Sequence, residues 1–283
     1  MNRLTVGVQG VGVLGPGIGC WPEYLELLRA GDGDINHKPG PKLSHKPGAT
    51  LLPASQRLPS AERRRAGAAI KMAIAVADEA VLQAGIDPQW LATVFTASNG
   101  EGANCHNLCE TLASADRSVS PTRFTNSVHN AAAGYWHIAV ASRAASTSLC
   151  GFDASFGAGL LEAVTQVAAT NQAVLLVATD TPYPEPLHAK RALRDNFGLA
   201  LLLTPISASQ GLAWLRMSLR SPPHEMPATA CRDAALEDLR SSLPAAAGLA
   251  LLDAIAQPGR EQRVIVNCPP ALQLHIDVAP QAH

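Results

Sequence analysis

The stretch ASTSLCGFDASFGAGLLEA, residues 145–163, contains a short strand, a turn and the first half of a helix. The strand covers Ala145–Leu149, and the helix of small residues extends from Ala154 to Ala169. The apolar run Ala173–Thr179 follows as a second strand. Short apolar strands that alternate with helices indicate a layered α/β fold whose sheet faces are covered.

The same alternation continues on both sides of this stretch. Further strands are predicted at residues 4–14, 90–97, 199–204, 213–219, 263–267 and 272–278, and further helices at 22–30, 60–84, 104–114, 127–142, 231–241 and 245–256. The segment from Asp32 to Pro59 is rich in Pro, Gly, Lys and His without an apolar period, which predicts a long surface loop.

The composition is apolar for a soluble chain, with 47% hydrophobic and 16% charged residues among 283. Much surface is therefore expected to be hidden, in packed helices or against a partner. A formal net charge of −1 argues against nucleic acid and anionic membranes as partners. We expect a reduced cytoplasmic protein, because no apolar stretch is long enough to span a bilayer, the first residues do not form a signal peptide, and the six cysteines are scattered.

Two motifs that could hold a cofactor or a metal are better explained by packing. The run Gly10–Gly15 matches the dinucleotide pattern G-x-G-x-x-G, but more helix-breaking residues follow before the helix begins at Pro22. Cys105, His106 and Cys109 lack a second pair of ligands nearby. We expect no cofactor and no metal, and a glycine turn that lets backbones pack closely.

The turn that contains Cys150 is the best place for a nucleophile. A helix N-terminus can depress a thiol pKa, and His129 and His137 are candidate bases, so an active Cys–His enzyme stays open on the residues alone. A separate cluster of basic residues is either a solvated helix face or a docking site for an acidic carrier protein. It consists of Arg57, Arg63, Arg64 and Arg65.

The blocks SPTRFTNSVHNAAAGYWHIA (residues 120–139) and 145–163 resemble the β-ketoacyl synthase-like chain length factors of aryl polyene biosynthesis, a family of N-terminal-half ketosynthases. The opening VGVQGVGVLGPG and the run DNFGLALLL (residues 195–203) are also similar to synthases. The resemblance implies a thiolase-like layered fold (αβαβα) with a reduced C-terminal half. Residues 1–205 would form the N-terminal half, and residues 206–283 a truncated half that completes the sheet.

The sequence differs from active synthases at the residues that carry out condensation. Ungapped alignment places Asp153 at the nucleophile position, with Cys150 three residues earlier, and a carboxylate cannot form the acyl thioester. None of the histidines after Pro205 lies in a synthase motif. The resemblance therefore implies no ketosynthase activity from this chain alone.

By the same resemblance, the chain would pair with a catalytic ketosynthase subunit through strand 145–149, and an acyl carrier protein would dock on the arginine cluster. Side chains near the partner's acyl tunnel would set product length by steric exclusion. The tunnel candidates are Phe124, His129, Tyr135, Trp136 and Phe152. Two alternatives stay open: an independent acyltransferase or thioesterase that uses Cys150, and a homodimeric acyl-binding scaffold.

Overall fold

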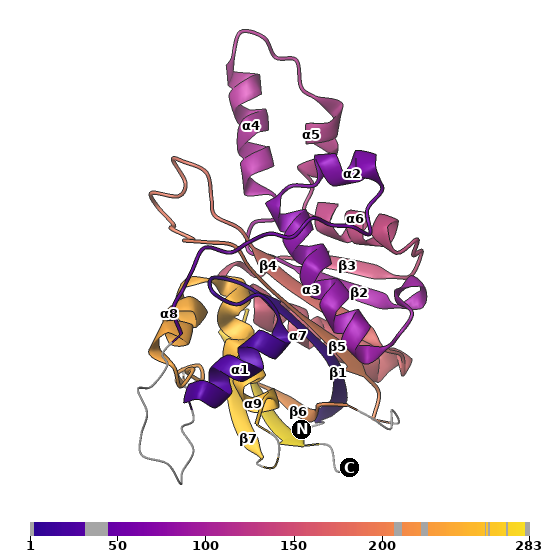
Figure 1. Cartoon of the computed structure of the whole chain (residues 1–283), viewed down its shortest axis with the longest axis vertical. Coiled ribbons are helices and arrows are strands. Elements are labelled where there is room, and N and C mark those ends of the chain that lie inside the picture. Colours follow the sequence, from indigo (N-terminus) through magenta and orange to yellow (C-terminus); the bar gives the residue numbers. More distant parts are fainter. Residues whose placement is uncertain are drawn as a thin grey trace.

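The computed structural model describes residues 3–31, 45–206, 211–221, 226–257, 259, 261–269 and 271–280. Within these ranges one sheet of eight strands has the order β3-β2-β4-β5-β1-β6-β8-β7 (Figure 1). The strands are β1 (Leu4–Leu14), β2 (Ala92–Thr96), β3 (Ser146–Leu149), β4 (Val174–Asp180), β5 (Phe197–Thr204), β6 (Ala213–Arg220), β7 (Gln262–Cys268) and β8 (Leu272–Pro280). The strands β3, β2 and β4 pair in parallel, and the other pairs are antiparallel.

The helices either cover one of the two faces of this sheet or, like α4 and α5, extend beyond it (Figure 1). They are α1 (Trp21–Gly31), α2 (Ser60–Arg65), α3 (Ala68–Ala84), α4 (Gly102–Ala113), α5 (Pro121–Asn126), α6 (Ala131–Ala139), α7 (Ser155–Thr170), α8 (Ala234–Ser242) and α9 (Leu249–Ile255), with 3-10 turns η1 (Pro88–Trp90), η2 (Phe152–Ala154) and η3 (Pro244–Gly248). Helices α3 and α6 share one apolar cluster with one face of the sheet, and α1, α7, α8 and α9 contribute to the cluster on the other face.

Helix α7 lies between the two halves of the sheet. It contacts β2 and β4 from the N-terminal half and also β7 and β8 from the C-terminal half. The layers therefore follow one another in this order. Helices α3 and α6 form the first layer, and strands β1 to β5 form the second. Helix α7, with η3 and α9, forms the third, and strands β6, β7 and β8 form the fourth. The layered α/β fold predicted from the sequence is confirmed. The reduced C-terminal half takes the form of antiparallel strands with a polar outward face, which water can cover.

The glycine run of β1 is a packing device. A Cβ at Gly10 would lie 2.0 Å from the carbonyl oxygen of Ala80, and one at Gly12 would lie 2.0 Å from that of Val76. Both oxygens belong to α3, so the strand and the helix pack backbone against backbone. The packing interpretation of this run explains both glycines without a nucleotide.

Three predicted helices differ from the observed ones because of local caps. The predicted helix 60–84 is split into α2 and α3, since Gly67 is extended and serves as the N-cap of α3. The predicted helix 127–142 is the shorter α6, and a separate helix, α5, precedes it, because the Ser120 hydroxyl caps α5 by accepting from the N–H of Arg123. Helix α8 begins three residues later than expected, because Asp233 accepts from the first N–H groups of the helix.

Candidate functional site

The turn between β3 and α7 lies where the parallel strands end. Cys150 follows β3 directly, and the 3-10 turn η2 leads into α7. The Ser155 hydroxyl accepts from the N–H of Gly151 at 3.0 Å and donates to the carbonyl of Phe152 at 2.6 Å. Phe152 has a φ of 53°, a left-handed conformation that costs a non-glycine residue about 1–2 kcal/mol. The Ser155 hydrogen bonds hold this strained turn in place.

An arginine from the β4–β5 loop neutralises Asp153, the residue that the ungapped alignment predicts at the nucleophile position. The Asp153 carboxylate is 72% exposed and forms an ion pair with Arg191. The Arg191 guanidinium carbon also lies 3.6 Å from the ring centroid of Phe152, which is a cation–π contact. Residue 153 thus carries a paired carboxylate, which cannot form an acyl thioester. Sequence reasoning missed Arg191, because its loop contains no motif and lies far along the chain.

The candidate nucleophile Cys150 has no histidine bonded to it among the described residues. Its exposed thiol donates to the carbonyl of Ser98 at 3.2 Å. His137 contacts Thr93 instead, with 3.2 Å between ring nitrogen and hydroxyl. Thr93 and Ser98 are five residues apart along β2 and its end, or about 16 Å in an extended strand. His137 therefore lies far from the thiol. His129 is exposed and lies against Gly100.

A buried carboxylate that sequence reasoning missed ties the two halves together beneath the turn. Asp180, at the end of β4, accepts from the N–H groups of Ser98 at 2.9 Å and of Ala245 at 2.7 Å. Burial raises the pKa of Asp180 above its ordinary value, although these hydrogen bonds act in the opposite direction. An acidic residue that ends a fully apolar strand was the signal for it.

Two clefts border Asp153, and both have C-terminal residues on their other walls. The larger, of about 580 Å³, is lined by α8 residues and by Asn267, and the smaller, of about 300 Å³, by Phe152, Pro269 and Leu272. None of the described residues that line them is a histidine. The ion pair of Glu237 and Arg240 faces the larger cleft.

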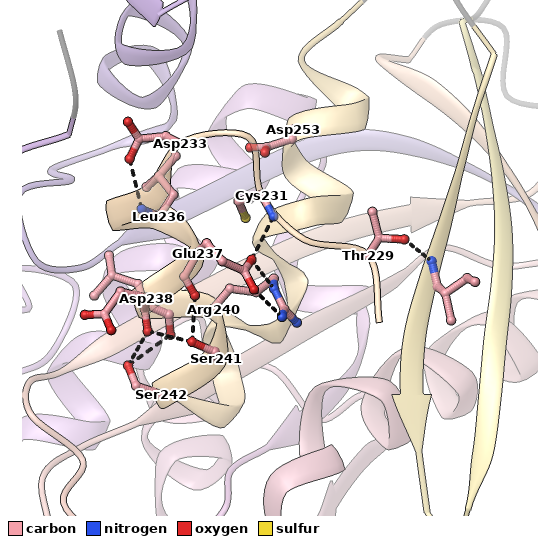
Figure 2. Close-up of polar contacts among 12 residues, drawn as sticks. Thr229, Cys231, Asp233, Leu236, Glu237, Asp238, Arg240, Ser241, Ser242 and Asp253 are labelled. Carbon is pink, nitrogen blue, oxygen red and sulfur yellow. Dashed lines mark hydrogen bonds and ion pairs between the residues drawn. The ribbon is translucent and has the colours of Figure 1, made fainter. Parts of the chain in front are cut away.

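That pair belongs to α8. Figure 2 shows the Glu237 carboxylate between the Arg240 guanidinium, at 2.6 Å, and the N–H of Cys231, at 2.8 Å. The hydrogen bond from Arg240 holds the pKa of Glu237 below its ordinary value. Burial raises the pKa of the Cys231 thiol beside it, so Cys231 is no thiolate nucleophile at neutral pH.

The five tunnel candidates do not converge on one surface. Tyr135 and Trp136 are buried in the apolar cluster with α3, and Trp136 is fully enclosed. Phe124 and Phe152 are exposed, at 66% and 59%. A tunnel role for these residues stays a prediction, and Phe152 is the most direct one to test because it is exposed and lines the smaller cleft beside Asp153.

The arginine cluster at α2 is partly engaged within the chain. Arg57 pairs with Asp78, Arg63 donates to Gln56, and Arg65 lies 3.1 Å from Glu62. Arg64 is exposed and forms no ion pair with a described residue. Exposed pairs of this kind are weak, so a stronger acidic partner could compete for them, and carrier docking here stays a prediction.

The other sequence motifs add no site. Cys105 and Cys109 are exposed on α4, and no group of three or more metal-ligating side chains occurs in the described part of the chain. In that part, no helix is both long and apolar enough to cross a bilayer. The histidines His224 and His283 lie outside the described residues.

Solved structures share the fold. A ketosynthase in complex with its chain length factor from Xenorhabdus doucetiae matches at a TM-score of 0.69 and 22% identity, over 97% of this chain and 99% of that one. The ishigamide ketosynthase/chain length factor matches at a TM-score of 0.67 and 15% identity, over 98% of this chain and 100% of that one. The structure of a type II PKS acyl-carrier protein in complex with its ketosynthase matches at a TM-score of 0.72 and 10% identity, over 99% of this chain and 100% of that one.

The class that the fold defines is therefore a ketosynthase-like, thiolase-type layered α/β protein. The sequence matches the family described as β-ketoacyl synthase, N-terminal domain, over residues 38–262, and the chain belongs to that family. No curated protein matches the sequence.

Proposed function

We propose that this chain is the non-catalytic chain length factor of a two-subunit β-ketoacyl synthase. It pairs with a catalytic ketosynthase in the cytoplasm and limits the acyl chain made on an acyl carrier protein, in aryl polyene or related biosynthesis. The observation that carries the proposal is the combination of a free strand edge at β3 with a carboxylate at position 153, directly after that strand.

The free edge of β3 is suited to pairing with a second sheet. The strand is the first in the sheet order and pairs only with β2 among the described residues. The N–H groups of Thr93 and Ala97 bond to the carbonyls of Ala145 and Leu149, so these carbonyls face β2. Since backbone groups alternate along a strand, those of Ser146 and Ser148 point outward. An unpaired edge is a template for another strand.

Exposed apolar side chains accompany this edge. Figure 1 shows α4 and α5 extending beyond the body of the molecule, and α6 near β3. These helices and their connection carry Leu112, Phe124, Val128 and Ile138, exposed at 54%, 66%, 47% and 50%. Exposed large apolar side chains on successive elements favour a protein interface. The relatives named as synthase complexes with a chain length factor supply the analogy for the partner.

Co-expression with the catalytic synthase gene of the same cluster tests the pairing. We expect a stable 1:1 complex on gel filtration with light scattering. A monomer with no affinity for the synthase would contradict the proposal, and a stable homodimer that retains lipid would favour the scaffold alternative. An acyl adduct detected by intact mass, and lost in Cys150→Ser, would favour the acyltransferase alternative.

Phe152→Ala in the complex is expected to lengthen the main product by at least one two-carbon unit. Removal of the ring leaves space for acyl chains that the phenylalanine side chain excluded. Product lengths measured by mass spectrometry check this. Leu82→Ala, a change at a 67% exposed leucine on α3, is the control and should leave the distribution unchanged. Trp136 is unsuitable for this test, because emptying a fully buried tryptophan site costs about 3–5 kcal/mol of stability. An unchanged distribution in Phe152→Ala would remove this side chain from the tunnel.

A further inference from the structure

The outward face of the C-terminal strands is open among the described residues. Burial alternates along β6, where Leu215 and Met217 are buried and Arg216 between them is exposed. Strands β7 and β8 alternate in the same way, with Val264, Val266 and Ile276 facing the core. Helix α9 contacts β7 and β8 and belongs to that core cluster, so it covers the inner face.

Strand register gathers arginines on the outer face. Arg216 on β6 is paired with Asp277 on β8, which is paired in turn with Arg263 on β7. Arg220 lies further along the same side of β6. Arg3 approaches from the start of β1, 3.8 Å from Asp277. The four arginines thus lie on β6 and β7, the two strands that flank β8, and at the residue before β1.

Positive charge exceeds negative charge on this face. Asp277 forms ion pairs with both Arg263, at 2.7 Å, and Arg3, at 3.8 Å. Glu261 forms an ion pair with Arg216 at 3.6 Å. Arg220 is exposed and forms no ion pair with a described residue. Among the described residues of this face, four arginines against two acids leave an excess of two positive charges, on a chain whose formal net charge is −1. The field of this face is therefore opposite in sign to that of the whole chain.

The centre of the face is less polar than its rim. Ile265 on β7 is half-buried and paired with His275 on β8. The His275 Nε2 and the Gln273 Oε1 are shielded from solvent and have no hydrogen-bond partner in the described part of the chain. Burial, with Arg220 and Arg263, lowers the pKa of His275, so its ring is neutral at neutral pH. The centre thus carries no charged side chain among these residues and the arginines lie around it, as in protein interfaces, where charged residues are depleted at the core and arginine is enriched.

We propose that this arginine face, formed by Arg3, Arg216, Arg220, Arg263, Ile265 and His275, docks an acidic surface of a partner protein. Guanidinium groups bind carboxylates through two parallel hydrogen bonds, and an excess of positive charge steers an acidic protein toward the face. The choice of probe rests on the proposed function: the acyl carrier protein of the same gene cluster is the acidic partner of the assembly. The competing site is the cluster of Arg57, Arg63, Arg64 and Arg65.

The test uses the complex of this chain with its synthase and a fluorescently labelled carrier protein, with affinity measured by anisotropy at low salt. Arg216→Glu/Arg220→Glu is expected to weaken binding about tenfold or more, since like charges then face each other. Arg29→Glu/Lys46→Glu changes the net charge equally elsewhere on the surface and is expected to stay within about twofold. Circular dichroism and melting temperature establish that each variant is folded.

The outcomes separate this inference from the proposed function. Failure of the unsubstituted chain to bind the synthase removes the proposed function. A complex that forms, and binds the carrier equally well with and without Arg216→Glu/Arg220→Glu, overturns the inference. It is also overturned if only Arg63→Glu/Arg64→Glu weakens carrier binding, or if the arginine face binds duplex DNA or anionic vesicles and not the carrier.

Discussion

Replacing Gly12 by alanine is expected to lower the free energy of unfolding by about 3 kcal/mol or more, the upper range for overpacking a core. A Cβ there would lie 2.0 Å from the carbonyl oxygen and 2.8 Å from the carbonyl carbon of Val76. These are backbone atoms in the middle of α3, so no side-chain rotation relieves the clash. Strand and helix must separate, and the apolar cluster between them opens. Urea unfolding followed by circular dichroism measures the change.

Gly134→Ala is the matched control. Gly134 lies inside α6, and a Cβ there meets nothing within 4 Å. Alanine in place of an unneeded helical glycine is expected to raise stability by about 1 kcal/mol. Opposite signs for the same chemical change would establish close backbone packing as the role of the glycine run. Equal stability of Gly12→Ala and the unsubstituted chain would refute it.

The alternation of strands and helices was predictable because β4 and β5 are buried along their whole length, as their sequences indicate, and because a helix such as α3 has its own stop signal. Gly85, for example, takes the left-handed conformation that ends α3. The errors lie where a cap acts against the apolar pattern. Gly67 interrupts a continuous run of helix-forming residues, and Ser120 with Pro121 starts a helix before the apolar period begins. Periodicity reports burial and does not detect such caps.

The candidate site was predictable in position and only partly in composition. The strand–turn–helix pattern located Cys150 and Asp153 at the carboxyl end of the parallel strands, where the structure places them. Arg191 and Asp180 were missed, because both act through contacts between segments distant in sequence. Asp180 joins the ends of β2 and β4 to η3, and such a junction follows from the fold and not from local spacing.

Ser148→Pro is expected to weaken association with the catalytic synthase about a hundredfold, the effect of losing an edge hydrogen bond and leaving its partner buried and unpaired. The outward N–H of Ser148 would bond across the proposed interface, and proline has none. The substitution removes no hydrogen bond to β2. The carbonyls of Ala145 and Leu149 bond to β2, and since backbone groups alternate along a strand, those of Ser148 point the other way. Proline is tolerated in edge strands, so the chain should fold.

Ser148→Ala keeps the N–H and is expected to stay within about twofold of the unsubstituted affinity. Analytical ultracentrifugation of the purified subunits measures both constants, with melting temperatures as the folding control. Loss of affinity in the proline variant alone would assign the association to the backbone edge of β3. If both variants bind as tightly as the unsubstituted chain, β3 is not the pairing strand. The exposed apolar side chains of α4, α5 and α6 would then have to carry the interface without it.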